Sequence, residues 1–328
     1  MDRDEHSVGT DKSDKLEKIT EISRNQEIIL DELAPFGISL FMKREDELHP
    51  HISGNKYRKL KYNLREAASN GHRTLLTFGG AYSNHIAALA YAGRLHGFNT
   101  IGVIRGDELI GREDLICGNP TLDFARKQGM QLEFISRELY RKKSDPFFEA
   151  LLNERFGDFY LVPEGGTNEL AVRGCEEILT EQDADFDYVC VAVGTGGTIS
   201  GLVNSSRRGQ RTLGFQSLKG DFLEAEIAKR TISEQDWSLV KDYHFGGYAK
   251  INEKLISFIN RFYRSTTIPL DPIYTGKMMY GLVDLIKNKH FEKNSRILAV
   301  HTGGLQGIEG MNRKLAKKKM PLLCSETG

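Results

Sequence analysis

Apolar residues follow two alternating patterns along the chain: short runs rich in β-branched and aromatic residues, and longer stretches with helical spacing. This alternation is typical of parallel sheets covered by helices on both faces, so we predict an α/β fold. The predicted strands cover residues 40–43, 74–78, 100–104, 132–135, 159–162, 188–193, 212–215 and 297–301. The predicted helices cover residues 57–70, 84–96, 120–128, 146–155, 170–179, 222–229, 252–263, 277–288 and 307–317, and a further helix opens at Ile199.

The chain has 328 residues, so we expect two domains, each large enough for its own core. No repeat, low-complexity tract or linker rich in Pro, Gly and Ser separates them. The chain is therefore predicted to cross between the domains more than once, with boundaries close to the catalytic cleft. Lys plus Arg and Asp plus Glu each number 45, and this balance argues against a general nucleic-acid or membrane-surface binder.

The cysteines and the N-terminus indicate a reducing compartment. Cys117, Cys175, Cys190 and Cys324 are scattered and have no Cys-x-x-Cys spacing, so neither a zinc site nor a disulfide framework is indicated. Residues 1–18 are charged rather than apolar, and no later apolar run approaches a membrane-spanning length. We predict a soluble cytoplasmic protein with a disordered polar tail over residues 1–20.

Lys56 is the candidate nucleophile. A lysine forms a Schiff base when its environment lowers its pKa, and the neighbouring cations Arg58 and Lys59 act in that direction. The alternative is that three basic residues in four simply begin a solvated helix.

A glycine-rich segment, Gly194-Thr195-Gly196-Gly197-Thr198, follows the predicted strand 188–193. It precedes a helix whose free N–H groups can hold a phosphate, and the two threonine hydroxyls add donors. A dinucleotide fingerprint would need glycine where Ile199 stands, and a P-loop would need lysine where Thr198 stands. The segment therefore predicts a cradle for one phosphomonoester, with a plain strand-to-helix turn as the alternative.

A second strand end, Gly79-Gly80, leads into Ser83-Asn84-His85 at a predicted helix start. The free N–H groups there suit a substrate carboxylate, and Ser83 can also serve as an ordinary helix N-cap. His85 is predicted to be structural, because the other histidines form no recognised metal-ligand pattern with it. We expect no metal site.

Five ordered blocks together resemble the fold-type II pyridoxal-phosphate enzymes. Within that group they are most similar to the branch of D-cysteine desulfhydrase and 1-aminocyclopropane-1-carboxylate deaminase. The blocks are Lys43-Arg44-Glu45-Asp46, Gly54-Asn55-Lys56 with Arg58-Lys59-Leu60, Ser83-Asn84-His85, Asp271-Pro272-Ile273-Tyr274-Thr275-Gly276-Lys277, and His301-Thr302-Gly303-Gly304. The resemblance runs from about Ile28 to the end of the last predicted helix.

The resemblance implies roles for several residues. Lys56 carries pyridoxal 5'-phosphate as a Schiff base, Asn84 bonds the phenolic oxygen of the cofactor, and Lys59 with the segment 194–198 binds its phosphate. Ser83 contacts the substrate carboxylate or assists proton transfer, while Tyr274 and Tyr248 face the substrate. The assignment of Tyr248 rests on a shorter sequence match, and the alternative is that Tyr248 packs in a loop.

The resemblance also implies an architecture. Two open, twisted, mainly parallel sheets are expected. A large cofactor domain would comprise residues 28–58 and 159–328, a smaller movable domain residues 59–158, and two chains would form a homodimer.

Two positions distinguish the branch activities. Ring-opening deaminases of this branch carry glutamate and leucine where this chain has Thr275 and Thr302, and the resemblance implies that both positions lie beside the pyridine nitrogen. A carboxylate would hold that nitrogen protonated, whereas threonine can only hydrogen-bond it. The resemblance therefore implies elimination of sulfide from a small D-amino acid such as D-cysteine, giving pyruvate and ammonia, with ring opening to 2-oxobutyrate as the alternative.

Other interpretations remain open. One alternative is a protein that binds a phosphorylated ligand without catalysis. A nucleotide-dependent enzyme is disfavoured, because the sequence lacks the dinucleotide and P-loop motifs at residues 194–199. Ser53 and Tyr82 depart from the branch, which often has glycine and glutamine there, and the phenol of Tyr82 is expected to reshape the substrate pocket.

Overall fold

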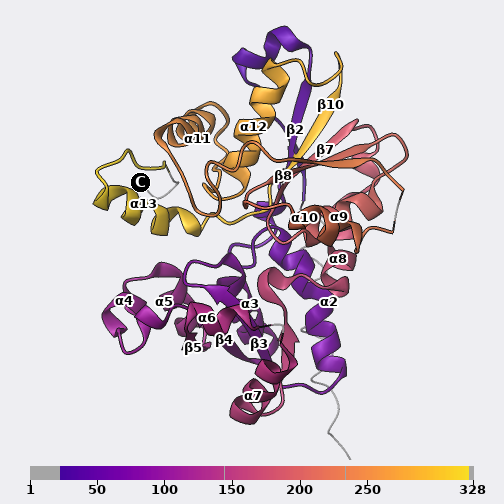
Figure 1. Cartoon of the computed structure of the whole chain (residues 1–328). Helices are drawn as coiled ribbons and strands as arrows, with labels where there is room; N and C mark the ends of the chain where they lie inside the picture. The colour runs from indigo at the N-terminus through magenta and orange to yellow at the C-terminus, as the bar shows by residue number, and fades with distance from the viewer. Residues whose placement is uncertain (1–22, 144, 233, 325–328) are drawn as a thin grey trace, which may run out of the picture.

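The computed structural model describes residues 23–143, 145–232 and 234–324. The predicted tail, residues 1–20, lies outside these ranges. Two mainly parallel sheets with helices packed against them confirm the predicted α/β fold (Figure 1). Within the described part of the chain, no helix is both long enough and apolar enough to cross a membrane.

The larger sheet has six strands in the order β1-β2-β10-β7-β8-β9. Only its edge pair β1 and β2 is antiparallel, and the other neighbours are parallel. Its strands are β1 (Asn25–Glu27), β2 (Ser39–Lys43), β7 (Tyr188–Val193), β8 (Arg211–Gln216), β9 (Trp237–Val240) and β10 (Arg296–Val300). The strands β1 and β9, which the hydrophobic pattern did not predict, are the two edges.

The smaller sheet has four parallel strands in the order β5-β4-β3-β6. They are β3 (Thr74–Gly80), β4 (Asn99–Arg105), β5 (Gln131–Ile135) and β6 (Tyr160–Val162). Because Leu75 to Thr77 of β3 pair with β6, residues 160–162 belong to this sheet. After β6 the chain passes to the larger sheet, and the predicted start of the large domain at residue 159 stays a prediction.

Helices lie between most of the strands in chain order, as the predicted α/β pattern requires. They are α2 (Asn55–Ser69), α3 (Asn84–His96), α4 (Glu113–Cys117), α5 (Pro120–Lys127), α6 (Arg137–Arg141), α7 (Pro146–Phe156), α8 (Glu169–Glu176), α9 (Gly197–Ser205), α10 (Phe222–Ala228), α11 (Glu253–Thr266), α12 (Thr275–Lys287) and α13 (Gly307–Lys317). Short 3-10 turns cover Asp31–Phe36, Glu45–Glu47, Asp107–Leu109, Glu164–Gly166 and Glu181–Asp183.

The central strand β7 shows why both faces of the larger sheet are covered. Its residues Val189, Val191 and Val193 pack with α9 and α10 on one face. Cys190 and Ala192 point the other way, into a core built with α11, α12 and α13. Every residue of β7 after Tyr188 is buried, as expected for a parallel strand between two helical layers.

Helix α2 joins the two parts of the fold. Tyr57, Leu60 and Leu64 on this helix belong to the core of the smaller sheet, and the helix also lies along α8 (Figure 1). The predicted domain boundary between residues 58 and 59 therefore cuts a continuous helix. The N-terminal turn of α2 consequently stands at the junction between the two sheets.

Candidate active site

Lys56 stands in the first turn of α2, where a cavity opens between the two sheets. The preceding Gly54 has φ 63°, and an added Cβ would lie 2.2 Å from the carbonyl of Thr302, so only glycine allows these two segments to approach. The Lys56 Nζ donates to Asn55 Oδ1 over 3.0 Å. Burial, and next the charge of Lys59, lower the pKa of Lys56 to about 7, which leaves much of the amine neutral and nucleophilic near pH 7.

Arg58 does not have the predicted part in this shift. Burial and Lys59 are the largest causes of the lowered pKa of Lys56. The Arg58 guanidinium instead makes a buried ion pair with Glu45, with Nε 2.8 Å from Oε2 and Nη2 2.8 Å from Oε1. Its charge is thereby compensated, and Arg58 fixes α2 to the segment after β2.

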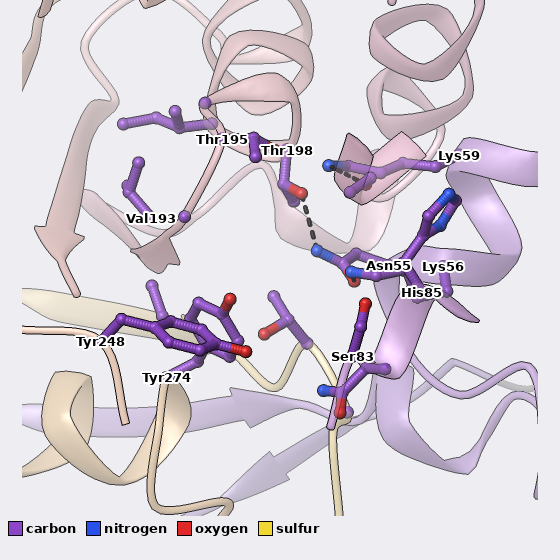
Figure 2. Close-up of a pocket in the computed structure, with 18 residues that line it drawn as sticks. Asn55, Lys56, Lys59, Ser83, His85, Val193, Thr195, Thr198, Tyr248 and Tyr274 are labelled. Carbon is purple, nitrogen blue, oxygen red and sulfur yellow. Dashed lines mark hydrogen bonds between the residues drawn. The ribbon is translucent and has the colours of Figure 1, made fainter. Parts of the chain in front are cut away.

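The glycine-rich segment after β7 forms one wall of the cavity. Gly196 has φ 89° and α9 begins at Gly197, so the N–H groups of the first turn of α9 face the cavity end. Thr198 accepts a hydrogen bond from Asn55 Nδ2 at 2.8 Å (Figure 2), which ties this wall to the lysine-bearing turn. Gly194, Thr195, Gly196 and Thr198 line the cavity. Gly197 begins the helix and is not among the residues that line the cavity; a Cβ added to it would lie 2.8 Å from Thr167 Cγ2.

Lys59 lies one turn along α2 from Lys56 and also lines the cavity. Its Nζ donates to Thr167 Oγ1 at 2.9 Å and to the Gly165 carbonyl at 3.2 Å. Thr167 Oγ1 is in turn 2.6 Å from Thr195 Oγ1. A cation, two hydroxyls and a helix N-terminus thus converge, which is the donor set that a phosphomonoester requires.

The turn after β3 supplies a second group of polar atoms. Ser83 is the N-cap of α3, with its Oγ accepting from the Ile86 N–H at 3.4 Å, and Asn84 begins the helix. Both line the cavity together with His85. His85 is buried and its Nε2 is 2.9 Å from Thr77 Oγ1, while its Nδ1 has no hydrogen-bond partner among the described residues.

Tyr248 and Tyr274 lie on the side of the cavity away from Lys59 (Figure 2). Their ring centroids are 6.3 Å apart at 62°. Burial raises the pKa of both phenols, so both stay protonated and can donate a hydrogen bond at neutral pH. The loop of Tyr248 is held by Lys277, whose Nζ donates to the carbonyls of His244 at 2.9 Å and Gly247 at 2.8 Å.

Thr302 and Thr275 occupy different positions. Thr302 lines the cavity. Thr275 is fully buried behind the wall, is not among the residues that line the cavity, and donates its hydroxyl to Asp271 Oδ2 at 2.6 Å. The predicted contact of Thr275 with the cofactor stays a prediction, and in this structure Asp271 takes its hydroxyl at the start of α12.

Sequence reasoning missed Asn55, Gly165 and Thr167. The segment Gly165-Gly166-Thr167 comes shortly after the end of β6, and Gly79-Gly80 form the end of β3; this similar pattern could have identified the segment. Among the described residues that line the cavity there is no Asp or Glu. No group of three His, Cys, Asp or Glu that could hold a metal ion occurs in the described ranges.

The side chains fit a phosphorylated aldehyde cofactor. The neutral amine of Lys56 suits an aldehyde, the cradle around Lys59 suits its phosphate, and the unpartnered His85 Nδ1 marks a buried polar atom at the cavity.

Comparisons with known proteins agree with this donor set. Residues 28–303 match the model of the family described as pyridoxal-phosphate dependent enzyme. A putative 1-aminocyclopropane-1-carboxylate deaminase of Pyrococcus horikoshii is 33% identical, covering 85% of this chain and 88% of the relative. A bifunctional D-cysteine desulfhydrase/1-aminocyclopropane-1-carboxylate deaminase of Arabidopsis thaliana is 30% identical over 84% of this chain and 74% of its own.

A further relative and a solved structure are also similar to this chain. A D-cysteine desulfhydrase of Klebsiella pneumoniae is 28% identical over 83% of this chain and 88% of the relative. A solved structure described as an ACC deaminase homologue aligns with a TM-score of 0.76 and 26% identity, covering 92% of this chain and 98% of that chain.

Proposed function

The chain belongs to the family of pyridoxal-phosphate-dependent enzymes, and from that premise we propose that it eliminates sulfide from D-cysteine, giving pyruvate and ammonia. Pyridoxal phosphate is the cofactor, and small amino acids are the substrates of its relatives. The observation that carries the choice of reaction is the absence of Asp and Glu from the described lining of the cavity.

The residues that line the cavity affect the reaction because they determine whether the pyridine nitrogen of the cofactor is held protonated. Without a carboxylate beside it, that nitrogen is not held protonated, so the cofactor is a weaker electron sink. A substrate with a good leaving group then reacts more easily than a cyclopropane, whose ring bond offers none. Thr302 presents only a neutral hydroxyl to the cavity, and the hydroxyl of Thr275 is taken by Asp271.

We assign the cofactor contacts to Lys56 for the aldehyde, Asn84 for the phenolic oxygen, and Lys59 with residues 194–198 for the phosphate. The bound cofactor supplies electron withdrawal from the α-carbon of the substrate. The neutral amine of Lys56 accepts the α-proton, and the N-terminus of α3 with Ser83 holds the carboxylate. The C–S bond breaks, and the departing thiolate takes a proton from Tyr274 or Tyr248, both protonated at neutral pH; water then completes the conversion to pyruvate and ammonia.

Ring opening of 1-aminocyclopropane-1-carboxylate is the second candidate, because several relatives carry that name. We also propose a homodimer, supported by the family resemblance, and light scattering of the purified protein should give twice the chain mass. A cytoplasmic location stays a prediction.

The test is product analysis with D-cysteine, L-cysteine, D-serine and 1-aminocyclopropane-1-carboxylate offered separately to the holoenzyme. We expect pyruvate and sulfide from D-cysteine at a rate well above that of 2-oxobutyrate from the cyclopropane. Lys56→Ala is the control that should lose both activities. Formation of 2-oxobutyrate at an equal or higher rate would replace the desulfhydrase assignment by the deaminase.

A further inference from the structure

The ring of Tyr82 lies against helix α13, and Tyr82 is not one of the described residues that line the cavity. A Cβ added to Gly310 would lie 2.8 Å from both Cδ1 and Cε1 of this ring. One turn along α13, Lys314 places its Nζ 4.1 Å from the ring centroid, a cation–π contact. Tyr82 therefore acts on the cavity through its neighbours, because Gly310 and Lys314 on α13 hold its ring, and its predicted effect on the substrate pocket stays a prediction.

Asn84, two residues further on, meets the segment that leads into the same helix. A Cβ on Gly304 would lie 2.6 Å from Asn84 Nδ2, and one on Gly307 would lie 3.9 Å from Asn84 Oδ1. Glycines at 304, 307 and 310 thus face Tyr82 and Asn84, and we call these three residues the glycine seat. The turn after β3, in the smaller sheet, rests here on the segment after β10, in the larger sheet.

Ser83 stands between the two seated residues and lines the cavity. Among the described residues, its hydroxyl makes one long N-cap hydrogen bond, 3.4 Å from the Ile86 N–H, so its position depends on the backbone on either side. Tyr82 directly precedes Ser83 in the chain, so the packing of its ring on Gly310 restrains the backbone that carries the serine. A displacement of about 1 Å at a reacting group can cost roughly 100-fold in rate.

We infer, on the premise of the proposed amino-acid lyase, that Tyr82 is a positioning residue, which fixes Ser83 against the substrate carboxylate by packing its ring on Gly310 and Lys314. The contact spans the two sheets, so it also sets the smaller sheet relative to α13. Helix α13 lies next to α5, which packs with the smaller sheet (Figure 1). Arg313 on α13 donates a hydrogen bond to the carbonyl of Gly118, just before α5.

The first test is the pair Tyr82→Ala and Tyr82→Phe in the holoenzyme. Tyr82→Ala should raise the KM for D-cysteine by about tenfold or more, with cofactor content and thermal unfolding midpoint close to wild type. Tyr82→Phe keeps the ring on its seat and should restore the wild-type KM. A role in stability alone would lower the unfolding midpoint of Tyr82→Ala and leave the KM of the folded fraction unchanged, and that result would overturn the inference.

The second test is coupling across the contact. Gly310→Ala should raise the KM while Tyr82 is present, because its Cβ displaces the ring, and should add nothing in the Tyr82→Ala background. Additive effects would contradict the contact. Lys314→Ala should raise the KM slightly, whereas Lys317→Ala, which removes an exposed cation one turn further along, is the matched control without effect.

A binding measurement separates this inference from the proposed function. D-alanine has no leaving group, and its affinity can be read from the absorption change of the bound cofactor. If the wild type does not turn over D-cysteine, the proposed reaction fails, yet weaker D-alanine binding in Tyr82→Ala would still support the positioning role. Equal D-alanine affinity in wild type and Tyr82→Ala would refute that role whatever the reaction.

Discussion

The rate at which the apoprotein captures pyridoxal phosphate should depend on pH through Lys56. Burial and the charge of Lys59 lower its pKa from 10.5 to about 7. Only the neutral amine attacks an aldehyde, so capture should rise between pH 6 and 8 and then level off. At pH 7.5 roughly three-quarters of the amine would be neutral, against about one part in a thousand for an ordinary lysine, a difference of roughly 700-fold.

The assay follows cofactor absorption after mixing apoprotein with pyridoxal phosphate across pH 6 to 9.5, with each variant normalised to its own plateau. Lys59→Gln removes a positive neighbour and should move the midpoint upward, although burial, the larger cause, remains. Lys61→Gln is the matched control: it removes an equal charge from the same helix, but its ammonium pairs with Glu177 at 2.7 Å. Its midpoint should match that of the wild type.

A midpoint near 10, with capture still accelerating above pH 9, would refute the buried neutral amine. A downward shift in Lys59→Gln would refute the electrostatic part of the reasoning alone. If the midpoint of Lys61→Gln shifted as much as that of Lys59→Gln, the total charge of the protein, rather than the neighbour Lys59, would set the midpoint.

Three further outcomes follow from the contacts of the site. Gly196→Val should weaken pyridoxal phosphate retention in equilibrium dialysis far more than Thr198→Ser does. Gly196 has φ 89° and an added Cβ would lie 3.1 Å from Ile227, whereas serine at position 198 keeps the hydroxyl. Equal retention in the two variants would exclude residues 194–198 as the phosphate site. Thr275→Val removes the 2.6 Å bond to Asp271 and should lower the free energy of unfolding by about 1.5–3 kcal/mol in urea titrations, whereas no change would show that the bond is not formed. Lys277→Met frees the loop of Tyr248 and should raise the KM about tenfold with cofactor content retained; loss of cofactor instead would place Lys277 in the binding site.

The central elements of the fold follow directly from the sequence pattern. The strand β7 and the helices α3 and α13 have the predicted bounds, because each has a continuous buried face and clear end signals such as Ser83 before α3. The edge strand β1 has the sequence Asn25-Gln26-Glu27 and carries no apolar signal. This segment is a strand because it pairs with β2, and a local sequence pattern does not show which segments pair.

The site was predictable in its parts and less so in its connections. Glycine-rich strand ends marked the positions of the cradle and of Ser83, since ligands bind where parallel strands end. Sequence could not show that Arg58 pairs with Glu45, that Thr275 turns to Asp271, or that Tyr82 rests on Gly310. Each of these depends on a partner distant in the chain or on a side-chain direction, and the cofactor roles of the individual residues stay proposals.

Borohydride reduction of the holoenzyme followed by peptide mapping tests the central claim most directly. Reduction fixes the cofactor to the amine that holds it, so the modified peptide identifies the lysine without any assumption about substrate. We predict the pyridoxyl group on the peptide that contains Lys56. Modification of Lys59 or Lys277, the other lysines of lowered pKa near the cavity and its loop, would contradict the account.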